Sequence, residues 1–215
     1  MKHLRFYIAL CVVAFGCSAC TYKGAIRDDF YPPVAQQDQK IPRKVVVDWD
    51  KSIQVLRMTP VIYADIDLNP GLANAVKTEL ATVFEEVALM DDARRSKEGD
   101  LLAYVSATIV QSGFGRSYTC QITVALSDAR SKKLISNFAS SAPIEVGTPA
   151  GVYTSMLLTV ASLGMAFPGL YEFAAESYGT RAIEQLEAKL PEIVRAIAAE
   201  IRSKRKLVAS SQTAP

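Results

Sequence analysis

The chain has 215 residues, of which 50% are hydrophobic and 21% charged, with 24 lysines and arginines against 22 aspartates and glutamates. This length suffices for one well-buried core, so we expect a single domain. The nearly balanced charge gives no reason to expect a nucleic-acid partner. The only histidine, His3, lies in a segment that we expect to be removed, which excludes histidine-dependent catalytic triads from the mature chain.

Residues 1–16 have the three parts of an export signal. Lys2 and Arg5 form a short basic region, an apolar stretch runs from Phe6 to Phe15, and small residues precede a possible cleavage site. The apolar stretch is about half the roughly 20 residues that a helix needs to span a bilayer. We therefore expect residues 1–16 to be a signal peptide that is cleaved.

Two cysteines, Cys17 and Cys20, follow this signal. The small residues Ala14 and Gly16 before Cys17 resemble the lipobox of bacterial lipoproteins, in which the cysteine after the cut becomes the lipid-bearing first residue. The resemblance implies lipidation at Cys17, with Cys20 as the alternative. It also implies passage to the outer membrane, because Ser18 rather than an aspartate follows Cys17.

The other readings of Cys17-Ser18-Ala19-Cys20 need partners that the chain does not supply. A zinc site would need two further cysteine or histidine ligands, and a redox motif would have to open a helix. We expect no metal and no cofactor. Cys120 follows the pattern of a buried core thiol, and a Cys20–Cys120 disulfide is the alternative that an oxidising compartment would permit.

Residues 17–42 are polar and proline-containing, and they lack strand or helix periodicity, which predicts a lipid anchor and a polar tether. Apolar residues within this segment could instead dock on the domain or on a partner: Ile26, Phe30, Tyr31 and Val34. The folded domain is expected over 43–208, beginning with a strand at 43–50, and 209–215 is expected to be a disordered tail.

A second short strand is expected in either 52–58 or 60–66. Residues 69–92 have a proline at the first helical position and apolar residues at spacings of three and four, which predicts an amphipathic helix capped by Asn69. The stretches 101–110, 118–128 and 134–146 alternate apolar and polar residues, which predicts a three-strand antiparallel meander.

Residues 180–206 carry an apolar face at helical spacing and predict a closing helix, which Pro191 should kink or restart. The order of elements favours an α+β fold. We expect an antiparallel sheet, made of the meander and the amino-terminal strand, with amphipathic helices packed on one face.

The apolar segment 150–171 carries no charge before Glu172 and is long enough to cross a bilayer. It can be a core helix, a membrane-inserted helix or hairpin, or a partner surface. Membrane or partner contact is favoured slightly over the core, through Tyr153, Met156, Leu157, Leu163, Phe167 and Tyr171.

Several acidic residues are candidates for catalysis or metal binding. Asp65 and Asp67 begin like a calcium loop, but Pro70 stands where that loop needs glycine. Other acidic residues are adjacent or nearly so, as is typical of solvated surfaces: Asp48, Asp50, Glu85, Glu86, Asp91 and Asp92. We expect a protein that is not an enzyme.

The lipobox, a polar tether, a strand and helix, a meander with the turn LSDARSKKLI and a closing amphipathic helix together resemble small bacterial envelope lipoproteins. These are of the transport-auxiliary, lipopolysaccharide-transport and curli-secretion types. The resemblance covers residues 14–205 in outline. It implies a non-catalytic accessory or assembly subunit of a cell-envelope machine, held in the outer membrane by an N-terminal lipid that includes palmitate and facing the periplasm.

Its expected partners are the membrane and either another protein or further copies of the chain. The alternative is an oligomeric secretion-pore subunit with residues 150–171 inserted in the membrane.

Overall fold

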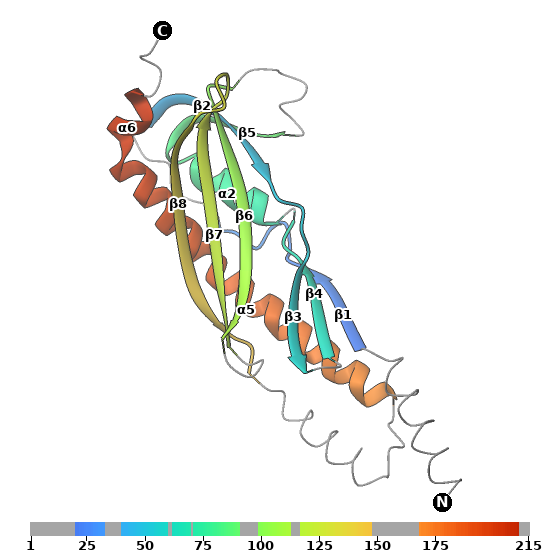
Figure 1. Ribbon diagram of the computed structural model, residues 1–215. Coiled ribbons are helices and arrows are strands. Elements are labelled where there is room, and N and C mark those ends of the chain that lie inside the picture. Colours follow the sequence, from blue (N-terminus) through green and yellow to red (C-terminus); the bar gives the residue numbers. More distant parts are fainter. Residues whose placement is uncertain are drawn as a thin grey trace, which may run out of the picture.

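The computed structural model describes residues 20–32, 40–59, 62–69, 71–90, 99–112, 117–147 and 168–210. They form two β-sheets that share one long helix (Figure 1). The α+β class is confirmed. Both sheets are mixed, however, so the prediction of a purely antiparallel sheet is wrong.

The larger sheet has five strands in the order β5-β2-β6-β7-β8. Its meander consists of β6 (Leu101–Ser112), β7 (Ser117–Asp128) and β8 (Leu134–Glu145), paired antiparallel as predicted. Strand β2 (Ile41–Trp49) joins this meander parallel to β6, and β5 (Phe84–Leu89) pairs parallel to β2 on the other side. The parallel pairs arise because the connections from β2 to β5 and from β2 to β6 contain helix α2.

The turn between β7 and β8 is organised by one carboxylate. Asp128 Oδ1 accepts hydrogen bonds from the main-chain N–H of Ser131 at 2.6 Å, from the Ser131 hydroxyl at 2.8 Å and from the main-chain N–H of Arg130 at 3.0 Å. These bonds hold the pKa of Asp128 below its usual value. Lys132 then takes a positive φ of 59°, which turns the chain into β8.

Helix α2 (Gly71–Leu80) is half as long as predicted. After Leu80 the chain turns, with the Val83 N–H bonded to the Leu80 carbonyl, and Phe84 begins strand β5. Val83 and Val87 continue the helical spacing in the sequence, but they belong to the turn and to β5. The helix yields to a strand here because the backbone of β5 completes its hydrogen bonds with β2.

The smaller sheet has three strands in the order β1-β4-β3. Strands β3 (Gln54–Thr59) and β4 (Ile62–Asp67) form an antiparallel pair, so both of the predicted stretches are strands. Strand β1 (Cys20–Ala25) pairs parallel to β4. The two sheets separate after Trp49. There the Gln54 side chain bonds the main chain of β6, donating to the Ala107 carbonyl at 3.1 Å and accepting from the Ile109 N–H at 3.2 Å.

Helix α5 (Pro168–Ser203) has 36 residues and runs behind both sheets (Figure 1). Apart from Tyr178, its buried side chains are small where it crosses the smaller sheet, and large ones follow farther on: Ala174, Ala175, Ala182, Leu186, Leu190, Ile193, Ile197 and Ile201. The predicted apolar face is confirmed. Pro191 lies inside the helix, which does not restart there. A short helix α6 (Arg205–Ser210) follows, so residues 209 and 210 are helical rather than tail.

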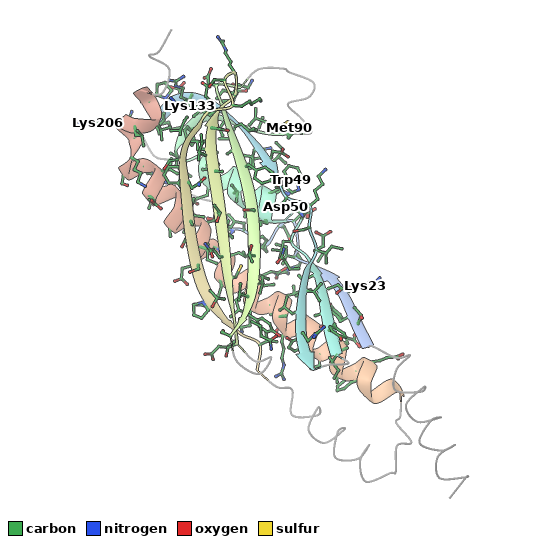
Figure 2. All side chains as sticks on the ribbon, in the orientation of Figure 1. Lys23, Trp49, Asp50, Met90, Lys133 and Lys206 are labelled. Carbon is green, nitrogen blue, oxygen red and sulfur yellow. The ribbon has the colours of Figure 1, made fainter. Side chains whose placement is uncertain are left out.

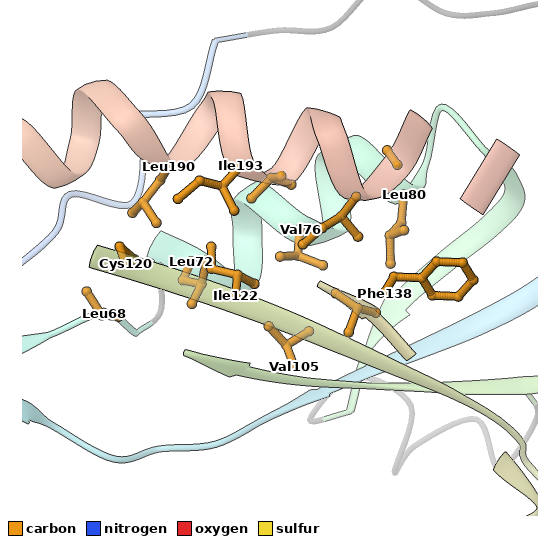
Figure 3. Close-up of a cluster of buried hydrophobic side chains, with 14 of the residues drawn as sticks. Leu68, Leu72, Val76, Leu80, Val105, Cys120, Ile122, Phe138, Leu190 and Ile193 are labelled. Atoms are coloured by element: carbon orange, nitrogen blue, oxygen red, sulfur yellow. The ribbon is translucent and has the colours of Figure 1, made fainter. Parts of the chain in front are cut away.

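The core lies between the larger sheet and helices α2 and α5 (Figure 3). Leu72, Val76 and Leu80 of α2 meet Leu190 and Ile193 of α5 above the inward residues of β7. In each strand of the meander the buried residues alternate with more exposed ones. The outward residues of β6, β7 and β8 therefore form a separate surface, which faces away from both helices.

Candidate functional site

The amino-terminal residues 20–32 belong to the folded domain. Ile26 is 2% exposed, and Phe30 and Tyr31 pack against the core. The predicted tether is therefore wrong for residues 20–32, and the docking that was considered as its alternative is confirmed for these three side chains. Burial of their apolar surface stabilises the bound segment. Val34 lies outside the described residues.

Strand β1 lies directly against the first half of α5. The ring of Tyr22 occupies the space that a side chain at Gly179 would fill, and a Cβ at Gly24 would come within 2.6 Å of Ile183 Cδ1. Glycine at both positions allows strand and helix to approach more closely than larger residues would. Tyr22 contacts Gly179, and Gly24, two residues later, lies against Ile183, four residues later. Strand β1 and helix α5 therefore run in the same direction.

An ion pair fixes the segment just after β1. The Arg27 guanidinium and the Glu187 carboxylate of α5 form a fork, with Nη2 donating to Oε2 at 2.9 Å. The main-chain N–H of Arg27 also donates to Glu187 Oε1 at 2.9 Å. The hydrogen bond and charge of Glu187 raise the pKa of Arg27 above its usual value. Because this guanidinium is exposed, the ion pair mainly fixes where the segment lies along α5 and adds little to the free energy of unfolding.

A second polar contact, in the interior, holds Tyr31. Its hydroxyl donates to Oε2 of Glu79, which lies in α2 and is 3% exposed, at 2.7 Å. Arg202 of α5 lies 3.7 Å from Glu79 Oε1 and also donates to the Thr82 hydroxyl. Burial, followed by the bond to Glu79, raises the pKa of Tyr31 above its usual value. This cluster joins the amino-terminal segment, α2 and α5 around one carboxylate.

A pair of buried tyrosines connects the two sheets with α5. The hydroxyl groups of Tyr118 in β7 and Tyr178 in α5 are hydrogen-bonded, and both residues are at most 2% exposed. The Tyr118 hydroxyl also donates to the main-chain carbonyl of Arg57 in β3 at 2.8 Å. Burial raises the pKa of both tyrosines. Neither hydroxyl is available as a base, so the pair is structural.

The predicted cysteine sites fall at the edge of the described chain. Cys17 lies outside the described residues, and Cys20 is the first residue of β1. Cys120 is fully buried, and burial raises the pKa of its thiol to about 12. The Cys20 side chain is outside the described part, so the Cys20–Cys120 disulfide stays a prediction.

The residues predicted to contact a membrane or partner also lie mostly outside the described residues: Tyr153, Met156, Leu157, Leu163 and Phe167. Tyr171 belongs to the first turn of α5. Among the helices that the structure describes, none is both long and apolar enough to cross a membrane.

Three ends of the described chain lie at one end of the molecule (Figure 1). They are the start of β1 at Cys20, the end of β8 near Val146, and the start of α5 at Pro168. The turn between β7 and β8, together with α6, lies at the opposite end (Figures 1 and 2). The predicted lipid site and the predicted apolar segment are therefore attached to the same end of the fold.

Several of the acidic residues named above have local structural partners, whereas Asp91 and Asp92 lie outside the described residues. Asp50 Oδ1 accepts from the Ser52 N–H at 3.1 Å, and Glu86 pairs with Lys44 at 2.7 Å. Asp67 Oδ1 accepts from the Asn69 N–H at 2.9 Å, which turns the chain from β4 towards α2. Among the described residues there is no group of three acidic, cysteine or histidine side chains arranged to hold a metal.

Comparisons with known proteins give only remote structural likenesses. No family model matches the chain, and no curated protein matches its sequence. Protein XCC0632 from Xanthomonas campestris is 15% identical, with 79% of this chain and 98% of that chain covered and a TM-score of 0.33.

Two further solved structures are similar at this level. The PelC dodecamer from Paraburkholderia phytofirmans is 14% identical over 67% of this chain and 93% of its own, with a TM-score of 0.33. Lipoprotein GNA1162 from Neisseria meningitidis is 13% identical over 57% of this chain and 97% of its own, with a TM-score of 0.28.

The contacts that hold the amino-terminal segment were not predicted from the sequence. Glu79 lies three residues after Val76 and one before Leu80, beside the apolar stripe of α2, and this position was the available signal that its carboxylate is buried. Arg27 and Glu187 are 160 residues apart and carry no comparable signal.

Proposed function

We propose that this chain is a lipid-anchored outer-membrane protein that faces the periplasm and acts as a non-catalytic accessory or assembly subunit of a cell-envelope machine. The observation that carries the proposal is the position of β1. It begins three residues after Cys17, the predicted lipid site, and is bound along α5.

This position of β1 shortens the expected distance between the domain and the membrane. Three extended residues span about 10 Å, whereas a free tether of some twenty residues would have reached about 60 Å. A lipid on Cys17 would therefore hold the end of the molecule that contains β1 close to the bilayer. Helix α5, about 54 Å long at 1.5 Å per residue, would carry the β7–β8 turn and α6 away from it.

The test is metabolic labelling with radioactive palmitate, followed by membrane fractionation. The wild-type chain should incorporate label and sediment with outer membranes, and Cys17→Ala should abolish the label while Cys20→Ala retains it. Label that survives Cys17→Ala but not Cys20→Ala would move the anchor to the first residue of β1. No label in the wild-type chain would refute the proposal.

The secretion-pore alternative has one observation in its favour. The apolar segment 150–171 connects to the same end of the fold as the predicted anchor, so it would meet the same membrane. The chain can be exported behind a cleavable signal without a lipobox and then extracted from membranes with alkaline carbonate. Retention in the membrane would favour insertion of the segment, and release would favour attachment by lipid alone.

A further inference from the structure

The outward surface of the meander differs in composition from an ordinary protein surface. We define the neutral face as the even-numbered residues 102–112 of β6 and the odd-numbered residues 117–127 of β7 and 137–145 of β8. Serine, threonine and alanine predominate there, and Glu145, at the very end of β8, is its one charged residue. Protein surfaces are ordinarily about 25–35% charged.

The outward surface of the smaller sheet provides the contrast. There Lys23 of β1 is opposite Asp65 of β4, and Arg57 of β3 stacks on Tyr63 at 5.0 Å. Charged residues are thus present on the outward surface of the smaller sheet, and in the larger sheet on β2 and β5, where Lys44 pairs with Glu86, but they are nearly absent from the neutral face. Depletion of charge is the compositional mark of the centre of a protein interface.

The neutral face is continuous and uncovered in the part of the chain that the structure describes. Helices α2 and α5 pack on the opposite side of the sheet (Figure 3). Val110, Thr119 and Pro143 lie side by side across three strands, and Val110 is 57% exposed. Three strands of 12 residues each present a flat footprint of roughly 570 Å². Two such footprints total on the order of 1,100 Å², which exceeds the roughly 1,000 Å² expected of a biological interface and lies at the small end of the size range.

We propose that the neutral face is the interface between two copies of this chain, packed sheet against sheet. A two-fold contact applies the same surface patch of both copies to each other, so a patch of one charge sign would repel its copy, whereas a neutral patch does not. A partner of opposite charge has nothing to recognise on this face. Packing of two sheets through residues with small side chains brings them about 10 Å apart.

The orientation of the face agrees with attachment of both copies to one membrane, and this step rests on the proposed function. The strands of the neutral face run along the molecule between the anchor end and the β7–β8 turn (Figure 1). A two-fold axis along that direction keeps both anchors at the same end. The alternative contact, antiparallel pairing of two β8 edges, would place the anchors at opposite ends. Pro143 also disfavours it, because proline removes one main-chain donor from β8.

The test measures self-association of the full chain in mild detergent by sedimentation velocity, with two matched substitutions. Val110 on the neutral face and Val55 on the smaller sheet are 57% and 59% exposed. Val110→Arg should raise the dissociation constant about tenfold or more, because it places two like charges in the contact, and Val55→Arg should leave it unchanged. Thermal unfolding of both variants establishes that they are folded, and Thr119→Arg provides a second variant on the face.

The outcomes separate this inference from the proposed function. A wild-type chain that stays monomeric at every concentration would overturn the inference. Binding of a different protein to the neutral face, with no self-association, would overturn it as well. Equal effects of Val110→Arg and Val55→Arg would also overturn it. Cys17→Ala should still associate in detergent, so loss of palmitate label with dimerisation retained would refute the anchor and leave the interface standing.

Discussion

The contact between Tyr22 and Gly179 determines whether Gly179→Ala raises or lowers the free energy of unfolding. Glycine inside a helix is about 1 kcal/mol less favourable than alanine, so Gly179→Ala should stabilise α5 by that amount if nothing lies against it. In the folded chain a Cβ at this position overlaps the Tyr22 ring. Displacing a packed ring costs about 1–3 kcal/mol, so we expect Gly179→Ala to lower the free energy of unfolding by about 1 kcal/mol overall.

The assay is urea unfolding followed by the fluorescence of Trp49, the single tryptophan. In a Tyr22→Ala background the overlap is gone, and Gly179→Ala should instead raise the free energy of unfolding by about 1 kcal/mol. The coupling between the two substitutions is then about 2 kcal/mol. Thr180→Ala, on the exposed side of the same helix turn, is the control and should stabilise slightly in both backgrounds. Stabilisation by Gly179→Ala in the wild-type chain would refute the placement of β1 on α5.

Three further predictions concern buried polar groups. Tyr31→Phe removes a hydroxyl that donates to a buried carboxylate and should lower the free energy of unfolding by about 1.5–3 kcal/mol; an unchanged urea midpoint would contradict the role of that contact. Tyr118→Phe should cost more than Tyr178→Phe, because the Tyr118 hydroxyl has two partners and its loss leaves a main-chain carbonyl of β3 unpaired; the same denaturation assay would show the reverse order if Tyr178 were the main donor. Burial raises the pKa of the Cys120 thiol from 9.0 to about 12, so its contribution to stability is complete below pH 9.0 and is lost as the pH rises towards 12. Cys120→Ala should therefore lose less stability than the wild-type chain between those pH values, and parallel pH profiles would exclude this contribution.

The meander and the closing helix could be predicted because their patterns are local. Buried and exposed residues alternate along β7 from Tyr118 to Leu126 with no interruption, and the apolar spacing of α5 runs from Leu186 to Ile201. Each pattern has a single period, which is that of a strand in β7 and that of a helix in α5. Partners elsewhere in the chain are not needed to recognise it.

The direction of strand pairing and strand β5 could not be predicted, because both depend on distant partners. Phe84–Leu89 continues the helical spacing of α2, and only the backbone of β2, some forty residues earlier in the chain, makes it a strand. Tertiary pairing overrides local propensity in such cases. Nothing in the residues of β2 distinguishes a parallel neighbour from an antiparallel one.

The lipid site at Cys17 rests on the sequence alone and stays a prediction, because Cys17 lies outside the described residues. The residues around Cys17 form a short contiguous pattern that enzymes of lipid attachment would read in an unfolded chain. The docking of residues 20–32 depends on space at Gly179 and on a carboxylate at Glu79, and these meet Tyr22 and Tyr31 only after folding. The polar residues of the segment 20–32 are typical of a linker, which is why the sequence predicted a tether.

The attachment of β1 to α5 also governs when the domain can be completed. Arg27 and Glu187 are separated by 160 residues, and a ribosome delivers the first of them long before the second. Strand β1 can pair with β4 once both have emerged, but the side of β1 that faces α5 stays uncovered until that helix follows. A nascent chain of this protein should therefore depend on holding factors until its final helix has emerged, even though most of its sheet is made from neighbouring strands.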